Sequence, residues 1–275
     1  MINRFSTVVG VVLAFAAVIV SHVIDHGTIS QLINVPAFVV IFGGTIGATV
    51  AATSFEDLRV LVRGLKLAVN PAIPELAHTK GDLVDMAKQA RVSGVLSLES
   101  RARELDDPYL VHGLLYVVDG MDPEEIIEQM QAERRALHKQ EAAAGAFFET
   151  AGGFAPTFGI IGTVVGLIAV LSNMTNVAAL APSIAVAFTA TLWGVLTANA
   201  FWLPVGMRLK KIAGERQLVR EVQEAAVVSI ARGDTSVKLD RQLTLLLAGR
   251  LEVPRGRKER PEPPPAASKA EEAQS

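Results

Sequence analysis

The stretch that decides the fold is Gly152–Val205, which holds two long apolar runs. The first, from Gly152 to Met174, reads GGFAPTFGIIGTVVGLIAVLSNM, and the second, from Pro182 to Val205, reads PSIAVAFTATLWGVLTANAFWLPV. Neither run contains Lys, Arg, Asp, Glu or His. About 20 apolar residues, each adding about 1.5 Å, span the hydrocarbon core of a bilayer, which is roughly 30 Å thick. Each run is therefore long enough to cross a membrane once, and its many small residues suit close helix–helix contact.

Composition supports an integral membrane protein. Of the 275 residues, 50% are hydrophobic, the mean hydropathy is +0.36, and the apolar residues stand in blocks rather than at regular spacing. The net charge of −2 offers no basic field for nucleic acid. The absence of cysteine excludes disulfides, thiolate metal sites and cysteine nucleophiles.

Two further apolar runs, Phe5–Ile24 and Val35–Thr53, precede the central pair. The first is longer than the apolar core of a signal peptide and no small-residue cleavage site follows it, so we expect a retained membrane helix. The loop between the two runs carries His22 and His26 at a spacing that could bind a metal on a helix. Loop histidines are more commonly solvated, and we expect that here.

Apolar residues recur at helical spacing between the membrane runs, as in Leu58–Val69 and Pro123–Ala143, and after them in Asp240–Leu251. Strand-like alternation is nowhere sustained. Asp122 before Pro123 is typical of a helix start. The sequence thus predicts an all-α polytopic membrane protein with four transmembrane helices and a helical cytosolic domain. The expected divisions are membrane helices one and two (1–53), a cytosolic helical domain (54–149), membrane helices three and four as a channel wall (150–206), C-terminal cytosolic helices (207–253) and a disordered tail (254–275).

Orientation follows from the positive side chains that flank the runs. They fall on one side of the four predicted crossings, which places both termini in the cytosol: Arg4, Arg59, Arg63, Lys66, Arg134, Arg135, Lys139, Arg208, Lys210 and Lys211. The loops His22–Asn34 and Ser172–Pro182 have no Lys or Arg and are expected on the outer side.

No enzyme motif occurs, and the membrane runs lack the central carboxylate that usually marks an ion pathway. If the chain conducts cations, a partner must supply that carboxylate. Hydroxyls could line the path: Thr163 lies among glycines, and Thr191 lies on a stripe of small residues. The spacing leaves open whether they serve an ion or bond their own backbone one turn back.

Two prolines, Pro156 and Pro204, lie near the cytosolic ends of the third and fourth membrane runs. Their position alone favours a helix cap or stop, with flexion points as the alternative.

The run APTFGIIGTVVGLIAVLSNM followed by PSIAVAFTATLWGVL resembles the MotA/PomA stator subunits of the bacterial flagellar motor. A second, distant motif agrees: Arg91-x-x-Gly94-x-x-x-Leu98-Glu99 is similar to the family's cytosolic segment, and Val118-Asp119-Gly120 is similar too. The resemblance covers about residues 1–250.

The resemblance implies roles for particular residues. Arg91 and Glu99 match charges that contact the rotor protein FliG, and Pro156 and Pro204 match prolines linked to torque, which favours the functional interpretation of both. Thr191 matches a pore threonine. Thr163 matches a position occupied by Thr in sodium-driven members and by Ala in some proton-driven ones.

The resemblance also implies an assembly and a location. Five such subunits would surround two copies of a MotB/PomB partner in the inner membrane, and the partner's Asp would complete the ion path. The chain would be no enzyme and would need no cofactor beyond the transported H⁺ or Na⁺.

Some positions depart from the family pattern. Asn34 stands where some sodium-driven relatives have Asp, and Ser100 and Arg101 replace acids that often follow the Glu99 position. Proton and sodium coupling both stay open. The nearest alternative is an ExbB/TolQ-type energising subunit, although such proteins usually have three crossings. A small-solute transporter is a further alternative, but no inverted repeat supports it.

Overall fold

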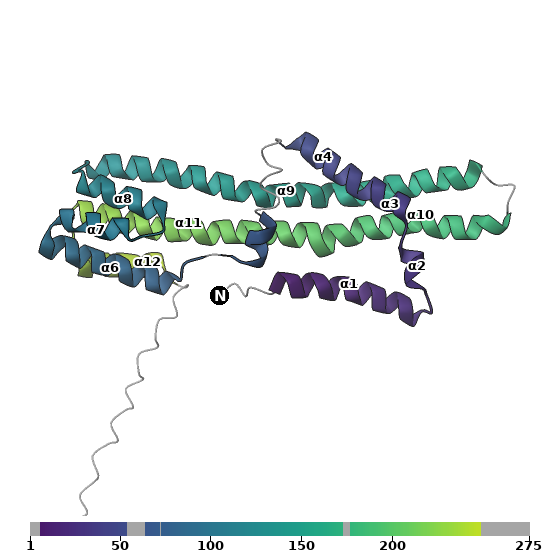
Figure 1. The fold of residues 1–275 in the computed structure, drawn as a ribbon, viewed down its shortest axis with the longest axis horizontal. Helices are drawn as coiled ribbons and strands as arrows, with labels where there is room; N and C mark the ends of the chain where they lie inside the picture. Colours follow the sequence, from purple (N-terminus) through teal and green to yellow (C-terminus); the bar gives the residue numbers. More distant parts are fainter. Residues whose placement is uncertain (1–5, 54–63, 72, 173–176, 249–275) are drawn as a thin grey trace, which may run out of the picture.

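The computed structural model describes residues 6–53, 64–71, 73–172 and 177–248, and no strand occurs in these ranges. Four helices within them are long and apolar enough to cross a membrane. The all-α, four-span prediction is therefore confirmed. Figure 1 shows two long helical columns side by side, with smaller helices gathered around one end and the membrane helices around the rest.

The first column is α9 (Pro123–Ser172), a single helix of 50 residues. Its expected length is roughly 75 Å, more than twice the thickness of a bilayer core. The apolar pattern predicted one helix ending at Ala143 and another beginning near Gly152. The helix continues between them because residues 144–151, AGAFFETA, contain no proline and one glycine. The expected division between residues 149 and 150 thus falls inside a continuous helix.

The second column runs through α10 (Val177–Thr197), the π-helical segment η3 (Ala198–Trp202) and α11 (Leu203–Ala231). The helix begins at Val177 rather than at the predicted Pro182, so the proline lies one turn inside it. The widened π segment ends directly before Leu203–Pro204. A proline removes one backbone donor and crowds the preceding turn, which accounts for the local change of helical pitch.

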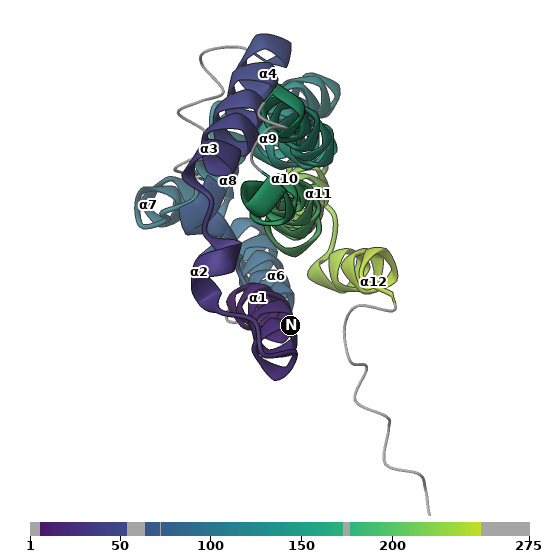
Figure 2. The same cartoon turned by 90° about the vertical axis from the view of Figure 1, so that its right-hand side faces the viewer.

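The remaining membrane helices lie on different sides of the columns. α1 (Ser6–Ile24) lies beside η3 and the start of α11, and the short α2 (Ile29–Leu32) follows it. The second predicted membrane helix consists of α3 (Val35–Phe38), a π segment η1 (Val39–Gly43) and α4 (Gly44–Ala52). It packs against α9, and Figure 2 shows it on the opposite side of the columns from α1.

Gly44 leaves room for the Phe158 side chain of α9 against α4. A Cβ atom added there would lie 2.1 Å from the Phe158 ring, so any side chain at this position would have to displace that ring. Pro36 lies in the first turn of α3, where its missing N–H costs least.

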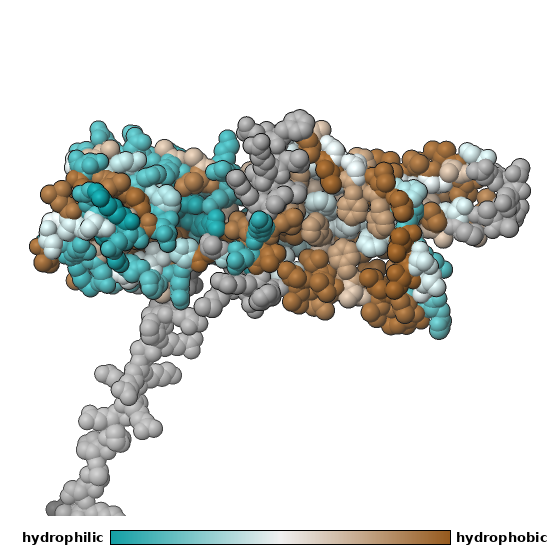
Figure 3. All heavy atoms as spheres, in the orientation of Figure 1, coloured by the Kyte–Doolittle hydropathy of each residue, from teal (hydrophilic) through white to brown (hydrophobic). Residues whose placement is uncertain are grey.

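The domain predicted to be cytosolic, called the cytosolic domain below, consists of α6 (Leu76–Ser93), the 3₁₀ turn η2 (Val95–Ser97), α7 (Leu98–Arg103), α8 (Pro108–Val118) and α12 (Ser236–Leu246). These elements pack against the ends of α9 and α11 and share one hydrophobic core with them. The core includes Leu83, Leu98, Leu114, Ile126, Met130, Val222 and Leu239. Figure 3 shows hydrophilic surface around this core and hydrophobic surface over α1 and α3–α4.

Helix starts in this domain follow their capping residues. The Asp122 carboxylate accepts a hydrogen bond from the Glu124 N–H at 3.0 Å, as the sequence predicted. Asp107 caps α8 in the same way, accepting from the Tyr109 N–H at 3.1 Å. The last helix begins at Ser236 rather than at the predicted Asp240, because the Thr235 hydroxyl caps it by accepting from the Lys238 N–H.

Some predictions fall outside the described residues. They are the disordered tail 254–275, the positive charges Arg4, Arg59 and Arg63, and the first part of a helix expected from Leu58 to Val69. Of that helix, residues 64–69 are described and helical.

Candidate ion-pathway wall and its cytosolic levers

Small residues bring α9 and α10 into backbone contact. A Cβ atom added at Gly194 would lie 2.7 Å from the Ala155 carbonyl oxygen and 2.8 Å from the Gly159 Cα. One added at Gly166 would lie 2.9 Å from the Ala187 Cβ. Such contacts are how membrane helices associate without a hydrophobic driving force between them. The two small-residue stripes recognised in the sequence therefore face each other.

The two candidate threonines lie at this contact. The hydroxyl oxygens of Thr163 on α9 and Thr191 on α10 are 2.6 Å apart. The Thr163 hydroxyl also lies 3.0 Å from the Ala187 carbonyl oxygen across the contact and 3.2 Å from the Gly159 carbonyl oxygen on its own helix. Because Thr163 has one hydroxyl proton, it donates to one acceptor at a time. Backbone bonding one turn back thus coexists with a contact between the helices.

The result is a half-buried cluster of four neutral oxygen atoms. Neutral oxygens can coordinate a hard cation or hold water, but they cannot take up a proton near neutral pH. The membrane runs that carry them contain no acid. No group of three or more His, Cys, Asp or Glu side chains that could hold a metal occurs in the described part of the chain, and His22 instead contacts the Thr28 carbonyl oxygen at 3.2 Å.

A second polar contact closes the outer end of the wall. The Asn34 amide donates to the Val186 carbonyl oxygen at 3.0 Å and to the Thr189 hydroxyl at 3.3 Å. The Trp193 indole N–H donates to the Leu32 carbonyl oxygen at 2.6 Å. Sequence reasoning treated Asn34 only as a departure from a family pattern and missed Trp193. The available signal was chemical, since a tryptophan in an apolar run needs an acceptor.

The two prolines lie at different levels of the columns. A Cβ atom added at Gly206, close to Pro204, would meet Gly145 and Glu149, whereas one added at Gly194 would meet Ala155, next to Pro156. Pro156 lies inside α9, so the interpretation of it as a helix cap or stop is wrong. Pro204 lies in the first turn of α11, directly after the π segment. Contact between the columns in this region is close, since a Cβ atom added at Gly152, one turn before Pro156, would lie 2.6 Å from the Leu203 side chain. Both backbones thus lack a donor where the columns touch.

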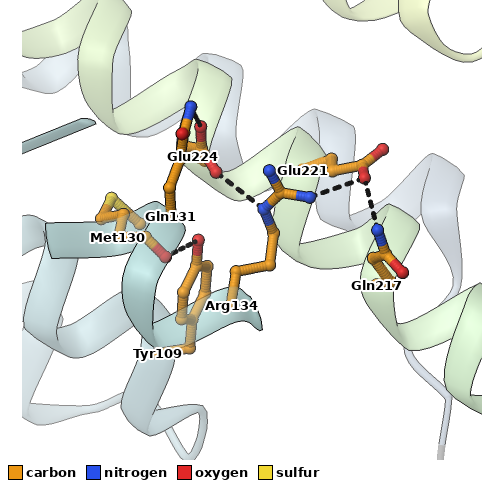
Figure 4. Close-up of polar contacts among 7 residues, drawn as sticks. All are labelled: Tyr109, Met130, Gln131, Arg134, Gln217, Glu221 and Glu224. Atoms are coloured by element: carbon orange, nitrogen blue, oxygen red, sulfur yellow. Dashed lines mark hydrogen bonds and ion pairs between the residues drawn. The ribbon is translucent and has the colours of Figure 1, made fainter. Parts of the chain in front are cut away.

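Beyond the prolines, ion pairs join α9 to α11 along their cytosolic parts. Arg134 on α9 donates to Glu221 at 2.7 Å and to Glu224 at 2.9 Å, with Gln131 and Gln217 completing the cluster (Figure 4). These pairs are largely buried, with 18% of the Arg134 side chain exposed. Nothing in the sequence spacing indicated them, because the partners are 87 and 90 residues apart.

Three further pairs, made by two carboxylates of α9, lie closer to the membrane. Glu141 on α9 accepts from Arg216 and in bidentate fashion from Arg220, at distances of 2.7 to 3.1 Å. Lys210 pairs with Glu149 next to the last membrane turn. Burial raises the pKa of Glu141, but the hydrogen bonds and charges of Arg220 and Arg216 outweigh it and hold that pKa below its usual value. We call the pairs of Arg134, Glu141 and Glu149 with α11 the ion-pair ladder.

The two charged residues of the second sequence motif lie at the end of the cytosolic domain. Arg91, in the last turn of α6, is exposed and donates to the Gly233 carbonyl oxygen at 3.4 Å. Glu99, in the first turn of α7, pairs with Arg103 at 2.6 Å. The turn between them needs Gly94, whose φ of +83° favours glycine. Figure 1 places α6 and α7 at the end of the molecule farthest from α10.

The sequence and the fold both match known proteins. Residues 8–86 match the family model "Motility protein A N-terminal", and residues 101–222 match that of the MotA/TolQ/ExbB proton channel family. The chain is 34% identical over 250 residues to Motility protein A of Bacillus subtilis (strain 168), covering 88% of this chain and 90% of the relative.

Two solved structures share the fold. "Structure of C. jejuni MotAB" aligns with a TM-score of 0.85 at 28% identity, covering 90% of this chain and 97% of the other. "Structure of the flagellar MotAB stator complex from Bacillus subtilis" aligns with a TM-score of 0.82 at 32% identity, covering 89% and 96%.

Fold, wall and similarity together define a multi-pass membrane protein of the MotA/TolQ/ExbB class. Within this class, the chain belongs to the motility protein A family. The resemblance noted in the sequence is therefore confirmed, and the ExbB/TolQ alternative is not supported.

Proposed function

We propose that this chain is a stator subunit of the flagellar motor, which forms a cation path together with a MotB/PomB-type partner and converts ion flow into torque. The observation that carries the proposal is the continuity of the two columns. α9 and α10–η3–α11 run from the hydroxyl pair in the membrane to the domain that holds Arg91 and Glu99. Both solved structures that share the fold are of MotAB assemblies.

The ion path passes along the wall at Thr163 and Thr191. Their hydroxyls offer exchangeable hydrogen bonds to a hydrated Na⁺ or to a water chain that carries H⁺. The partner's membrane helix supplies the ionisable carboxylate that these runs lack. Ionisable groups are costly in a bilayer, so they are rare there and usually mark an ion pathway. The transported cation is the substrate, and no other cofactor is required.

Force travels through the columns. Pro156 weakens the first column and Pro204 the second, both between the wall and the ion-pair ladder, so a change at the wall can bend the columns in this region. The ion-pair ladder beyond them holds α9 and α11 together, and the cytosolic domain then moves as one body.

The rotor protein FliG meets this body at Arg91 and Glu99. Complementary charges would steer the rotor surface into register at each step. The proposed assembly is a pentamer around a partner dimer in the inner membrane, with both termini cytosolic, which agrees with the distribution of Lys and Arg.

Swimming speed tests this function. A strain lacking the chain should lose motility and regain it on complementation. Speed that rises with sodium concentration at fixed pH assigns Na⁺, and sodium-independent speed assigns H⁺. Normal swimming of the deletion strain, in a cell without a second stator, would refute the proposal.

A further inference from the structure

A groove separates α1 from the second column. It has a volume of about 490 Å³ and is lined by Thr7, Gly10, Val11, Ala14, Asn199, Ala200, Pro204, Met207, Arg208 and Lys211. The α1 side is apolar or small throughout. No residue of α1 from Thr7 to Ile24 is buried, so this helix leaves the neighbouring space open. Figure 3 shows hydrophobic surface over α1.

The two charges of the groove stand at one end of it. Arg208 and Lys211 follow Pro204 by about one and two helical turns, on the side towards the cytosolic domain. Lys211 is exposed and makes no ion pair within the described residues, whereas its neighbour Lys210 pairs with Glu149. None of the described residues that line the groove is acidic.

The length of the groove suits one leaflet of a bilayer. Residues 199–211 rise by about 18 Å along the helix, and half of a hydrocarbon core is about 15 Å. An acyl chain can lie between α1 and η3, while its headgroup meets the two cations. Basic side chains at the cytosolic surface attract anionic lipids.

We propose that this groove binds an anionic phospholipid of the cytoplasmic leaflet, with its phosphate at Arg208 and Lys211 and one acyl chain along Gly10 and Ala14. The lipid fills the gap that the unburied α1 leaves and holds this helix against the widened segment before Pro204. The inference depends on the membrane placement of the chain and is independent of torque generation.

The test uses the full chain in complex with its partner, reconstituted into phosphatidylcholine vesicles. A small fraction of phosphatidylglycerol carries a photoreactive group on its acyl chain, and a parallel sample carries the same group on phosphatidylcholine. Mass spectrometry then locates the labelled peptides. We expect phosphatidylglycerol to label α1 and the start of α11 several-fold more than phosphatidylcholine does.

Two variants address the two halves of the site. Lys211→Gln should lower this labelling about fivefold, the loss expected for one basic side chain at a membrane surface. Gly10→Leu should abolish the labelling, because the leucine side chain fills the groove. The fold can accept this change, since no heavy atom lies within 4 Å of a Cβ atom added at Gly10. Matched controls are Lys88→Gln on α6 and Gly47→Leu on α4, where a Cβ atom is also free of contacts; both should label like the unaltered chain.

Each contrary result would refute one part of the proposal: the anionic headgroup, the position of the acyl chain, or lipid as the occupant of the groove. Equal labelling by both lipids, unchanged in Lys211→Gln, would show ordinary bulk lipid and no anionic site. Labelling that persists in Gly10→Leu would place the lipid elsewhere. Absence of α1 labelling by either lipid would show that protein, such as a neighbouring subunit, fills the groove in place of lipid.

Discussion

Thr163 and Thr191 join the third and fourth membrane helices through hydroxyl oxygens 2.6 Å apart, 28 residues from each other in the sequence. The contact forms only because glycine and alanine let the two backbones touch at Gly159 and Gly194. A polar pair is thereby held at a fixed place in an otherwise apolar wall, where the proposed ion path passes.

Thr191→Val keeps the shape of the side chain and removes its hydroxyl. We expect ion flux and swimming speed to fall strongly, because the Thr163 hydroxyl then bonds only to carbonyl oxygens. Stability should fall by only about 0.6 kcal/mol, the average for hydrogen bonds between membrane helices. Flux into proteoliposomes and thermal unfolding of the complex measure the two effects. Ser172→Ala is the control, since that exposed hydroxyl bonds only its own helix in the described structure. Normal flux in Thr191→Val would remove the hydroxyl from the path.

Arg134→Met breaks the largely buried part of the ion-pair ladder and leaves Glu221 and Glu224 without their cation. We expect a loss of about 1–3 kcal/mol in the free energy of unfolding, because an unpaired, partly buried carboxylate is costly. Arg101→Met removes an i,i+3 pair whose arginine side chain is 45% exposed, and it should cost less than about 1 kcal/mol. Denaturant titration of the unfolding transition of the cytosolic domain compares the two losses in free energy of unfolding. Equal losses would contradict the role given to the ion-pair ladder.

Glu141 should make stability depend on pH in the acid range. Its folded pKa lies below the ordinary value of 4.5, so it stabilises the folded chain above that value. This contribution is lost as the pH falls through the lower, folded pKa. Glu141→Gln should therefore unfold more easily at neutral pH and lose less additional stability on acidification. The exposed Glu128→Gln on the same helix is the control, and parallel pH profiles for all three chains would contradict the prediction.

Arg91→Glu reverses the exposed charge proposed to meet the rotor. We expect stall torque to fall while assembly with the partner is unaffected, because the only contact of its guanidinium in the described structure is a long hydrogen bond to Gly233. Tethered-cell rotation and purification of the complex measure torque and assembly. Lys88→Glu, on the same helix and paired with Asp85, provides a matched reversal. Normal torque in Arg91→Glu would assign the rotor contact elsewhere.

Pro156→Ala restores a backbone donor in the middle of α9. The helix should become stiffer and more stable, and torque should fall if flexion at this level transmits force. Pro108→Ala, in the first turn of α8, changes a proline that costs little where it is and should leave torque unchanged. Torque measurements on both, with complex assembly as the check, decide between a hinge and a merely tolerated proline.

The sequence by itself determined the four crossings and the all-α class of the chain, although α2 and the first turn of α10 lie in segments expected to be loops. A block of uncharged apolar residues shows directly that a segment can lie in lipid. Apolar residues at helical spacing among charges show directly that a segment can form an amphipathic helix in water. Both signals are local in the sequence. The sequence also determined that acids are missing from the membrane runs. The small-residue stripes around Thr163 and Thr191 were visible for the same reason, because residues three and four apart share a helix face.

Only the tertiary structure decided how those pieces connect. The pattern ended one helix at Ala143 and started another at Gly152, yet α9 passes through both, since a helix continues wherever nothing stops it and packing supports it. The pairs of Arg134 with Glu221 and of Glu141 with Arg220 join residues about 80 to 90 positions apart. No local spacing predicts such pairs, because they form only when two long helices lie side by side in one register.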